Sequence, residues 1–558
     1  MPELNRRSFL WTAASGCSLA APATGQIMQG TVHAASEWIF TSGKHYEDPF
    51  NQTDLDLLVS GPGASQARVP AFWSGGQEWR ARFAPPRAGR YTWRTACSDP
   101  SNGDLHGRTG SFPVESQADN QTDNNVLTQH GPIRVAPDRR HFEHSDGTPF
   151  FWLADTWWMG FCKRLRWPDD FQLLTADRVR KGFTAVQIVA GLYPDMPQFD
   201  SRGANEAGYP WEPNYSRINP AYFDMADLRV RWLAQNGLVP CVVGCWGYYL
   251  PILGIPRIKK HWRYLVARWG AYPVVWCLAG EGSMPYYLSK NRAEDAAAQK
   301  SGWTEMARYV RGIDPAHHPI TIHPTMAARD NVDDPSVLDF DMLQTGHGDR
   351  ESIPGTLEAI TKAYARAPHM PVIDGEVCYE GIQEASRQEI QRFMFWACML
   401  SGAAGHTYGA NGIWQVNNPG VPFGASPHGR SWGNTPWQTA YQLPGSGQIG
   451  MGKALLEKYR WWKMEPHPEW FDPHWSSKDY WQAYTAGKLR ISFLPRTRSV
   501  PFRMKNLEAD VRYRAFFFNP ASGERTELGG VQTDASGDWI IPAPPIFQDY
   551  VLVMEKAS

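Results

Sequence analysis

The most constraining feature of the sequence is an alternation of eight apolar segments with helix-like segments between residues 150 and 414. The apolar segments are short and rich in β-branched and aromatic residues, and helical patterns such as AYFDMADLRVRWLAQNG separate them. They read FFWLADTWW, FTAVQIVAGLY, LVPCVVGCWGYY, PVVWCLAGE, PITIHP, FDMLQTGHG, MPVIDGEVCYEG and AAGHTYGANGIW. This alternation predicts an α/β fold, with either a (β/α)₈ TIM barrel or a doubly wound open sheet.

Polar and aromatic residues gather at the C-terminal end of nearly every predicted strand, and this favours the barrel. A (β/α)₈ barrel builds its active site from the loops at that face. We therefore expect a (β/α)₈ catalytic barrel over residues 130–472.

Two regions of a different pattern flank the barrel. In residues 36–118, short alternating segments such as EWRARF are separated by Pro and Gly turns. This pattern is typical of an antiparallel β-sandwich. Alternation returns near the C-terminus in VRYRAFFFNPASGE and YVLVME. We expect one β-sandwich at 36–118 and a second at 473–558.

The first 35 residues resemble an export signal. Twin arginines, Arg6 and Arg7, precede Ser-Phe-Leu, a mildly apolar stretch and small residues, as in bacterial twin-arginine signals. No other segment approaches the ~20 apolar residues that span a bilayer. The sequence predicts a twin-arginine-type signal peptide at 1–35, a periplasmic or secreted location, and no membrane partner after cleavage.

Composition narrows the function classes. With 55 basic and 56 acidic residues the net charge is −1, which gives no indication of a nucleic-acid partner. No HxH or HExxH spacing is present, so we expect neither a metal nor another cofactor. The GRSWG segment at 429–433 matches an esterase motif but follows a Pro/Gly loop instead of a strand. Composition makes no prediction about the oligomeric state.

Two glutamates occupy equivalent places in the predicted barrel. Glu281 follows the fourth strand and Glu376 lies at the end of the seventh. These strands are three apart around the ring, so side chains at their ends converge on one cavity. Paired carboxylates across such a cavity can carry out glycoside hydrolysis. Each glutamate taken alone could instead be a structural ion pair or cap.

The barrel resembles the apiosidase-like glycoside hydrolases, whose architecture is related to the large retaining clan. The resemblance covers about residues 139–470 and rests on PFFWLADTWW, VVWCLAGE, PVIDGEVCYEG and GAAGHTYGANGIW. The Phe72–Trp93 region resembles the β-sandwich that often precedes such barrels. FFFNPASGE resembles part of a C-terminal collagen-binding-type β-sandwich.

The resemblance implies roles for the two glutamates. It makes Glu376 the nucleophile and Glu281 the acid/base of a retaining hydrolase that acts on a plant or bacterial polysaccharide or oligosaccharide. Glu281 should then be protonated at working pH and Glu376 ionised, with carboxyl groups about 5–5.5 Å apart. Family members tend to carry Gly-Gly-Asp where this chain has Ala279-Gly280-Glu281, which bears on the sugar more than on the reaction.

Further strand-end residues are predicted to bind the carbohydrate substrate, with filling of the core as the alternative for each. They are Asp155, Trp157, Trp158, Gln187, Trp246, Tyr248, His323, His347, His406 and Tyr408. A competing hypothesis is a non-catalytic carbohydrate-binding or adhesion protein on a degenerate barrel. The presence of both glutamates favours the enzyme.

Overall fold

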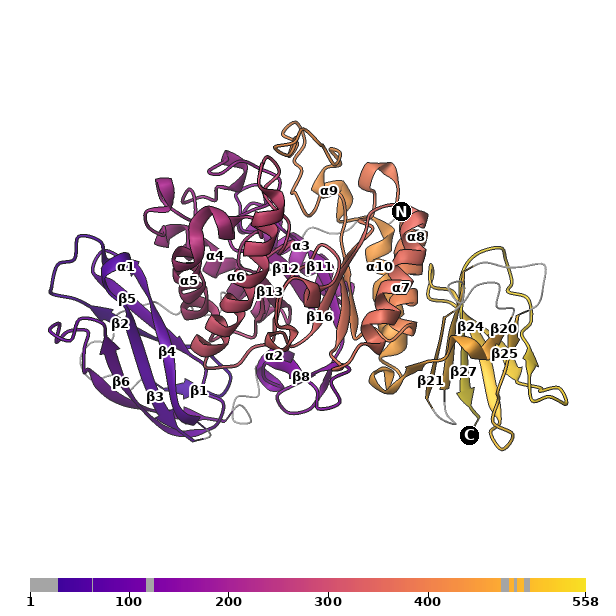
Figure 1. Ribbon diagram of the computed structural model, residues 1–558. Coiled ribbons are helices and arrows are strands. Elements are labelled where there is room, and N and C mark those ends of the chain that lie inside the picture. Colours follow the sequence, from indigo (N-terminus) through magenta and orange to yellow (C-terminus); the bar gives the residue numbers. More distant parts are fainter. Residues whose placement is uncertain are drawn as a thin grey trace, which may run out of the picture.

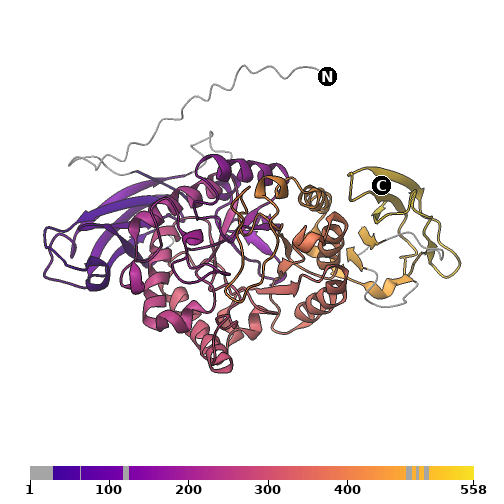
Figure 2. The ribbon, with the colours of Figure 1, turned by 90° about the horizontal axis from the view of Figure 1, so that it is seen from above.

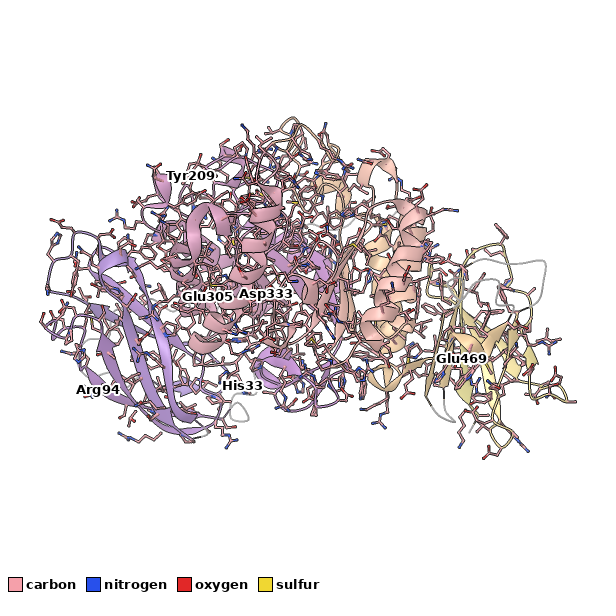
Figure 3. The ribbon with its side chains drawn as sticks, in the orientation of Figure 1. His33, Arg94, Tyr209, Glu305, Asp333 and Glu469 are labelled. Atoms are coloured by element: carbon pink, nitrogen blue, oxygen red, sulfur yellow. The ribbon has the colours of Figure 1, made fainter. Side chains whose placement is uncertain are left out.

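In the computed structural model the chain forms a central α/β barrel with one β-rich domain on each side (Figure 1). The structure describes residues 29–62, 64–116, 125–472, 481–485, 489–495 and 502–557. Most of the predicted export signal, residues 1–28, lies outside the described residues. Figure 3 shows the side chains of the barrel and of both flanking domains.

Eight parallel strands form the central sheet, with β11 hydrogen-bonded to both β12 and β18. The backbone N–H of Asp339 donates to the carbonyl of Ile320 over 2.8 Å, which joins β15 to the segment that leads into β16. The (β/α)₈ prediction is confirmed and the open sheet was the wrong alternative. The strands are β11 (Trp152–Thr156), β12 (Ala185–Val189), β13 (Val239–Val243), β14 (Val275–Cys277), β15 (Ile320–Thr321), β16 (Asp341–Gly346), β17 (Val372–Val377) and β18 (Gly405–Tyr408).

Helices surround this sheet when the molecule is seen from above (Figure 2). The long ones are α3 (Asp169–Arg180), α4 (Pro220–Gln235), α5 (Tyr249–Trp269), α6 (Arg292–Ile313), α7 (Ser352–Ala365), α8 (Gln388–Leu400) and α10 (Pro444–Leu456). The short ones are α1 (Pro49–Gln52), α2 (Val126–Gln129) and α9 (Trp437–Ala440). No helix in the described ranges is long and apolar enough to cross a membrane.

A small antiparallel sheet closes the N-terminal end of the barrel. It consists of β8 (Ile133–Val135), β9 (Phe142–His144) and β10 (Pro149–Phe150). The ring of Phe142 packs against Trp152 and Phe340, with centroids 5.6 and 5.1 Å away. Aromatic packing therefore closes the barrel interior at this end.

The N-terminal domain is one sheet folded into two layers, in the order β1-β7-β6-β3-β4-β5-β2. The long strand β4 pairs with β3 along its first half and with β5 along its second. Trp38 of β2 then packs on Phe112 of β7 at 5.1 Å. The strands are β1 (Gly30–Thr31), β2 (Ser36–Thr41), β3 (Leu55–Gly61), β4 (Ala64–Gly75), β5 (Glu78–Phe83), β6 (Gly89–Cys97) and β7 (Thr109–Glu115).

Strand β1 lies within the predicted signal peptide 1–35. It pairs with β7, with Gly30 opposite Val114 and Thr31 opposite Glu115. The fold of the N-terminal domain therefore starts earlier than the predicted boundary at residue 36.

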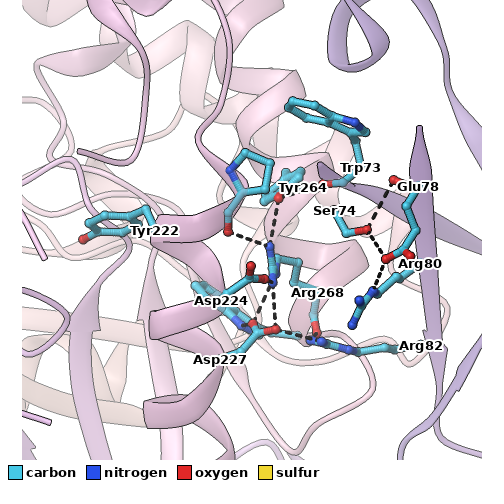
Figure 4. A network of polar contacts seen from close by, with 12 residues as sticks. Trp73, Ser74, Glu78, Arg80, Arg82, Tyr222, Asp224, Asp227, Tyr264 and Arg268 are labelled. Atoms are coloured by element: carbon cyan, nitrogen blue, oxygen red, sulfur yellow. Dashed lines mark hydrogen bonds and ion pairs between the residues drawn. The ribbon is translucent and has the colours of Figure 1, made fainter. Parts of the chain in front are cut away.

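A buried ionic network fixes the N-terminal domain to the barrel (Figure 4). Arg82 of β5 donates to Asp227 of α4 over 2.7 Å, and Arg268 of α5 donates to the same oxygen over 2.9 Å. Arg82 also donates to the backbone carbonyl of Arg268 over 2.8 Å. All three side chains are buried. A carboxylate shared by two arginines offsets the cost of removing these charges from water.

The C-terminal domain pairs a six-stranded with a three-stranded sheet. The first contains β19 (Glu465–Pro466), β21 (Trp481–Thr485), β22 (Leu489–Leu494), β27 (Tyr550–Lys556), β24 (Tyr513–Phe518) and β25 (Arg525–Gly530). The second contains β20 (Phe471–Asp472), β23 (Arg503–Met504) and β26 (Trp539–Ile540). Strands β19 and β20 precede residue 473, so the predicted boundary is several residues late.

Strand β27 of the six-stranded sheet is buried on both faces. Along β27, Val551 and Val553 belong to the core that includes the barrel, whereas Leu552 and Met554 belong to the core shared with the three-stranded sheet. At the barrel side, Arg392 of α8 donates two hydrogen bonds of 2.7 Å to Asp549. This domain therefore rests directly on the helix that follows the seventh barrel strand.

Candidate active site

A cavity of about 320 Å³ opens at the C-terminal ends of the barrel strands. Its walls carry three carboxyl groups, those of Asp195, Glu281 and Glu376. Four indole rings also line it, those of Trp158, Trp246, Trp414 and Trp432. Apolar walls with a few convergent polar groups are typical of a small-molecule site.

Glu281 is held in an unusual backbone conformation just after β14. Its φ is 45°, in the left-handed region that costs a non-glycine residue about 1–3 kcal/mol. The preceding Gly280 pairs with Trp246, and a Cβ on Gly280 would lie 2.2 Å from that indole ring. The Trp246 Nε1–H donates to Glu281 Oε2 over 3.2 Å. Glycine thus lets the indole pack close enough to orient the carboxyl group.

A β-bulge in β17 aims Glu376 into the cavity. Asp374 pairs with Leu343 and Glu376 with the next residue, Gln344, so Gly375 is the extra residue of the bulge. A Cβ on Gly375 would lie 2.4 Å from Met342 Cγ, so only glycine fits here.

Asp374 and Glu376 consequently lie on different sides of the sheet. The Cys398 thiol of α8 lies 3.8 Å from Asp374 Oδ2, and Thr345 donates to the same oxygen over 2.8 Å. Burial raises the pKa of Asp374 to about 8. This carboxyl group is therefore a neutral part of the layer between β17 and α8 and does not line the cavity.

One side chain spans the other two carboxyl groups. Gln344 Nε2 donates to Glu281 Oε1 over 3.2 Å and to Glu376 Oε1 over 3.1 Å. The two oxygens can therefore be no farther apart than the sum of these lengths, about 6.3 Å, and the ~120° between the two amide hydrogens gives about 5.5 Å.

Glu376 is stabilised in its ionised form. Burial acts to raise its pKa, but the interactions with His323 and His347 outweigh burial and hold the pKa well below the usual range. His323 Nε2 lies 3.1 Å from Oε2 and His347 Nε2 lies 2.8 Å from Oε1. The Tyr379 backbone N–H donates to His347 Nδ1, so Nε2 carries the proton that His347 donates to Glu376.

Glu281 has the opposite electrostatic environment. Burial, followed by the negative charge of Glu376, raises its pKa to about 7. A protonated acid and an ionised carboxylate therefore coexist near neutral pH. Such a pair can donate a proton and attack an electrophilic carbon in one step.

Aromatic contacts fix the remaining walls. The ring of Trp158 packs edge-on against Trp246 at 5.5 Å and His323 at 5.2 Å. Its Nε1–H donates to the Tyr379 hydroxyl over 3.0 Å, and the Tyr379 ring lies 4.5 Å from that of His347. The side chains that touch Glu376 are thus themselves held by packing.

Four of the ten predicted substrate-binding residues lie at this site. Trp158, Trp246 and His347 line the cavity, and His323 lies against Glu376. The structure places the other six elsewhere, with their side chains in contact with protein groups. They are Asp155, Trp157, Gln187, Tyr248, His406 and Tyr408.

Three of these six, Asp155, Trp157 and Tyr408, have side chains on the outer side of the barrel sheet. Asp155 accepts hydrogen bonds of 2.6 Å from Arg178 of α3 and from Trp157. Tyr408 donates to Glu380 over 2.5 Å. Alternate residues of a strand face opposite sides, and these residues face the helices. Their prediction as substrate ligands is corrected to a structural role.

The other three are also enclosed. Gln187 donates to the Gly375 carbonyl across the barrel interior over 2.8 Å. Tyr248 donates to the Tyr193 carbonyl over 2.8 Å. His406 packs against Phe395 of α8 at 5.7 Å and is fully buried. None of these three lines the cavity.

Several cavity residues were missed by the sequence reasoning. Gln344 lies three residues before His347 and Tyr379 three residues after Glu376, so strand-end position was a usable signal for both. Asp195 follows the second strand in LYPDMP, and Trp432 lies in the long segment after the eighth. Their position depends on loop paths that periodicity does not encode.

Family comparisons match most of the described barrel. A family model described as the apiosidase-like catalytic domain matches residues 136–463. A second, described as a domain of unknown function (DUF5060), matches residues 31–98. No curated protein sequence matches the chain.

Solved structures share the architecture. One described as a glycoside hydrolase is 21% identical, with a TM-score of 0.63 over 77% of this chain and 98% of that chain. A glycoside hydrolase family 5 protein from Bacteroides vulgatus is also 21% identical, with a TM-score of 0.63 over 77% of this chain and 94% of that chain. Another protein of that organism is 17% identical, with a TM-score of 0.69 over 95% of this chain and 100% of that chain. At these identities the likeness shows a shared fold.

Proposed function

Since this chain belongs to the apiosidase-like family and is a glycosidase, we propose that it cleaves by retaining double displacement with Glu376 as nucleophile and Glu281 as acid/base. The shared hydrogen-bond donor, Gln344, carries the proposal. It limits the two carboxyl oxygens to a separation of at most about 6.3 Å, below the ~6.5–9.5 Å of inverting enzymes. Ideal amide geometry gives about 5.5 Å, near the ~5–5.5 Å of retaining ones.

In the first step the Glu376 carboxylate attacks the anomeric carbon. The glycosidic C–O bond breaks, and Glu281 transfers its proton to the leaving oxygen. This leaves an ester between Glu376 and the sugar, with Glu281 ionised. The unequal pKa values support this division of roles, because Glu281 is raised to about 7 and Glu376 is lowered.

In the second step Glu281 accepts a proton from water. The resulting hydroxide attacks the anomeric carbon and breaks the ester, which restores the Glu376 carboxylate and protonated Glu281. Two inversions give net retention. The proposed substrate is a plant or bacterial polysaccharide or oligosaccharide.

Trapping the ester tests the mechanism. A panel of chromogenic furanosides and pyranosides identifies a hydrolysed glycoside, and its 2-deoxy-2-fluoro analogue with an activated leaving group is then incubated with the enzyme. We expect mass spectrometry to find one sugar on the peptide that contains Glu376. The Glu376→Gln variant should remain unlabelled, whereas Glu281→Gln should still be labelled because the activated group needs no acid.

The same experiment separates the enzyme from the alternative of a carbohydrate-binding protein. A binder would retain sugar affinity without turnover and without labelling at Glu376. Proton NMR of the first-formed product gives the stereochemistry. An inverted anomer would overturn the retaining mechanism.

We also propose export to the periplasm or beyond, from the Arg6-Arg7 segment. Since β1 (Gly30–Thr31) pairs with β7, cleavage near Ala21-Pro22-Ala23 would preserve the N-terminal domain better than cleavage after Ala35. Sequencing the N-terminus of protein from a periplasmic extract tests this. Arg6→Lys with Arg7→Lys should leave the precursor in the cytoplasm, and unchanged export would contradict the proposal.

A further inference from the structure

Asp195 is a third carboxyl group in the cavity that the mechanism does not use. It follows β12 and has a φ of 56°, in the left-handed region. Its backbone N–H donates to the Tyr287 hydroxyl over 3.1 Å. A non-glycine residue keeps this conformation only where its surroundings impose it. The loop therefore holds Asp195 in a fixed position at the cavity wall.

The carboxyl group of Asp195 differs from the structural aspartates of this protein. Asp155 pairs with Arg178 at 2.6 Å and Asp227 with Arg268 at 2.9 Å. Across the described ranges, no Lys, Arg or His nitrogen forms an ion pair with Asp195. Asp195 is therefore not explained as the partner of a nearby buried cation, as Asp155 and Asp227 are.

The neighbours of Asp195 leave it able to accept hydrogen bonds. Burial raises its pKa to about 6, and interactions with the side chain of Tyr287, the charge of His428 and the side chain of Trp432 act in the opposite direction. The group is therefore ionised at neutral pH. An ionised carboxylate has two oxygens and about four acceptor positions.

Asp195 also does not belong to the reacting pair. Gln344 spans Glu281 and Glu376, and within the described part of the chain Asp195 forms no hydrogen bond with that amide. Its negative charge nonetheless acts on both glutamates, since it contributes to the raised pKa of Glu281 and Glu376 contributes to its own. Asp195 thus faces the same space as the pair from another wall.

Two further loops enclose Asp195. Tyr287 comes from the segment between β14 and α6, and its ring stacks on His428 at 5.0 Å. His428 belongs to the segment between β18 and α9, which Arg202 anchors by donating to the carbonyls of Phe423 and Ala425 over 3.0 and 3.1 Å. An anchored wall makes the carboxylate a preorganised acceptor instead of a mobile surface charge.

We propose that Asp195 is a specificity-determining residue that accepts hydrogen bonds from two adjacent hydroxyl groups of the sugar in the cavity. The substrate class is then a neutral sugar unit with a vicinal diol. Two carboxylate oxygens match two neighbouring O–H donors. The aromatic wall excludes the water molecule that would otherwise take the place of a missing hydroxyl group. The inference rests on the proposed glycosidase function and adds the hydroxyl pattern of the substrate.

The proposal is tested by asking whether the effect of replacing Asp195 depends on the presence of individual sugar hydroxyl groups. The best chromogenic glycoside of the panel and its monodeoxy analogues are assayed with wild type, Asp195→Asn and Asp195→Ala. We expect wild type to lose at least about 100-fold in kcat/KM when a contacted hydroxyl is absent. Asp195→Ala should lose a similar factor in kcat/KM on the parent glycoside. Removing the contacted hydroxyl should then lower the kcat/KM of this variant little further.

Independent effects would overturn the proposal. If the losses from Asp195→Ala and from every hydroxyl deletion multiply in full, Asp195 contacts none of those groups. Asp195→Asn keeps one oxygen acceptor and should fall between wild type and Ala. Its unfolding midpoint, measured alongside, separates lost recognition from lost folding.

A binding experiment keeps this result separate from the catalytic mechanism. In the Glu376→Gln background, calorimetric titration with the released monosaccharide and its monodeoxy analogues should show the same coupling in Kd. That coupling supports the role of Asp195 even if no ester forms on Glu376. Equal affinities with and without the Asp195→Ala change would overturn it even if the ester does form.

Discussion

Glu281 and Glu376 accept hydrogen bonds from one and the same atom, Gln344 Nε2, over 3.2 and 3.1 Å. The shared donor fixes their spacing and also couples their electrostatics. Burial and the charge of Glu376 raise the pKa of Glu281, whereas the hydrogen bond from Gln344 lowers it. Gln344 is therefore a positioning residue that also moderates the acidity of the proton donor.

Replacing Gln344 by leucine should change both properties. We expect kcat/KM to fall about 10- to 100-fold, since both carboxyl groups lose a donor that orients them. The alkaline limb of the pH profile should move upward, because the group that lowers the pKa of Glu281 is gone. Gln344→Asn, which keeps the amide on a shorter chain, is the control. An unchanged pH profile in Gln344→Leu would show that the bridge has no electrostatic role.

The pH dependence of wild type should report Glu281. This group must be protonated to act as the acid, so it sets the alkaline limb, and activity is lost as pH rises through its pKa of about 7. Glu376 stays ionised across this interval and adds no alkaline limb. Values of kcat/KM, determined from initial rates between pH 5 and 9, measure this. A profile that stays flat to pH 9 would contradict Glu281 as the acid.

Asp155 should affect stability and not substrate affinity. Asp155→Asn leaves the fully buried Arg178 with one anionic partner fewer, which should cost about 3 kcal/mol of unfolding free energy. At temperatures where the variant remains folded, KM should match wild type. Denaturant unfolding and steady-state kinetics check the two halves. A raised KM with unchanged stability would restore Asp155 as a substrate ligand.

The bulge at Gly375 should tolerate no side chain. Gly375→Ala places a Cβ 2.4 Å from Met342 Cγ, and we expect a loss of about 1–3 kcal/mol together with most of the activity. Adding Met342→Ala should restore part of both. Gly355→Ala in α7 has nothing within 4 Å of its new Cβ and should be neutral or stabilising. Full activity of Gly375→Ala would exclude the close contact.

Asp227 should hold the N-terminal domain in place. Asp227→Asn removes the charge shared by Arg82 and Arg268 and should cost about 3–5 kcal/mol. Asp334→Asn breaks an exposed pair with Arg308 and should leave the unfolding midpoint unchanged. Chemical denaturation of both variants makes the comparison. Equal midpoints would mean that the buried network adds nothing to docking.

The barrel strands and the meeting of Glu281 and Glu376 in one cavity could be predicted from sequence, because apolar runs and their polar ends repeat along the chain. The same reasoning placed Asp155 at the site, since an apolar run followed by an acid looks alike on either face of a strand. Asp374 and Glu376 show the further difficulty. Alternation gives residues two apart the same face, and only the Gly375 bulge separates them.

The loop-borne part of the site required the structure. Asp195 and Trp432 are 237 residues apart in sequence, and neither lies in a periodic segment. Their meeting depends on contacts such as Arg202 with the Phe423 carbonyl, which are tertiary and leave no local pattern.

The C-terminal sheet, with Val551 and Val553 on one side and Leu552 and Met554 on the other, also limits how this protein can be engineered. A domain with one apolar face can be trimmed or exchanged between enzymes. Here excision would expose the surface around Phe393, whose ring packs on Phe493 at 5.4 Å. It would also leave Arg392 without its ion-pair partner Asp549. Libraries of truncated or chimeric variants should therefore carry residues 465–557 along with the barrel as one inherited unit.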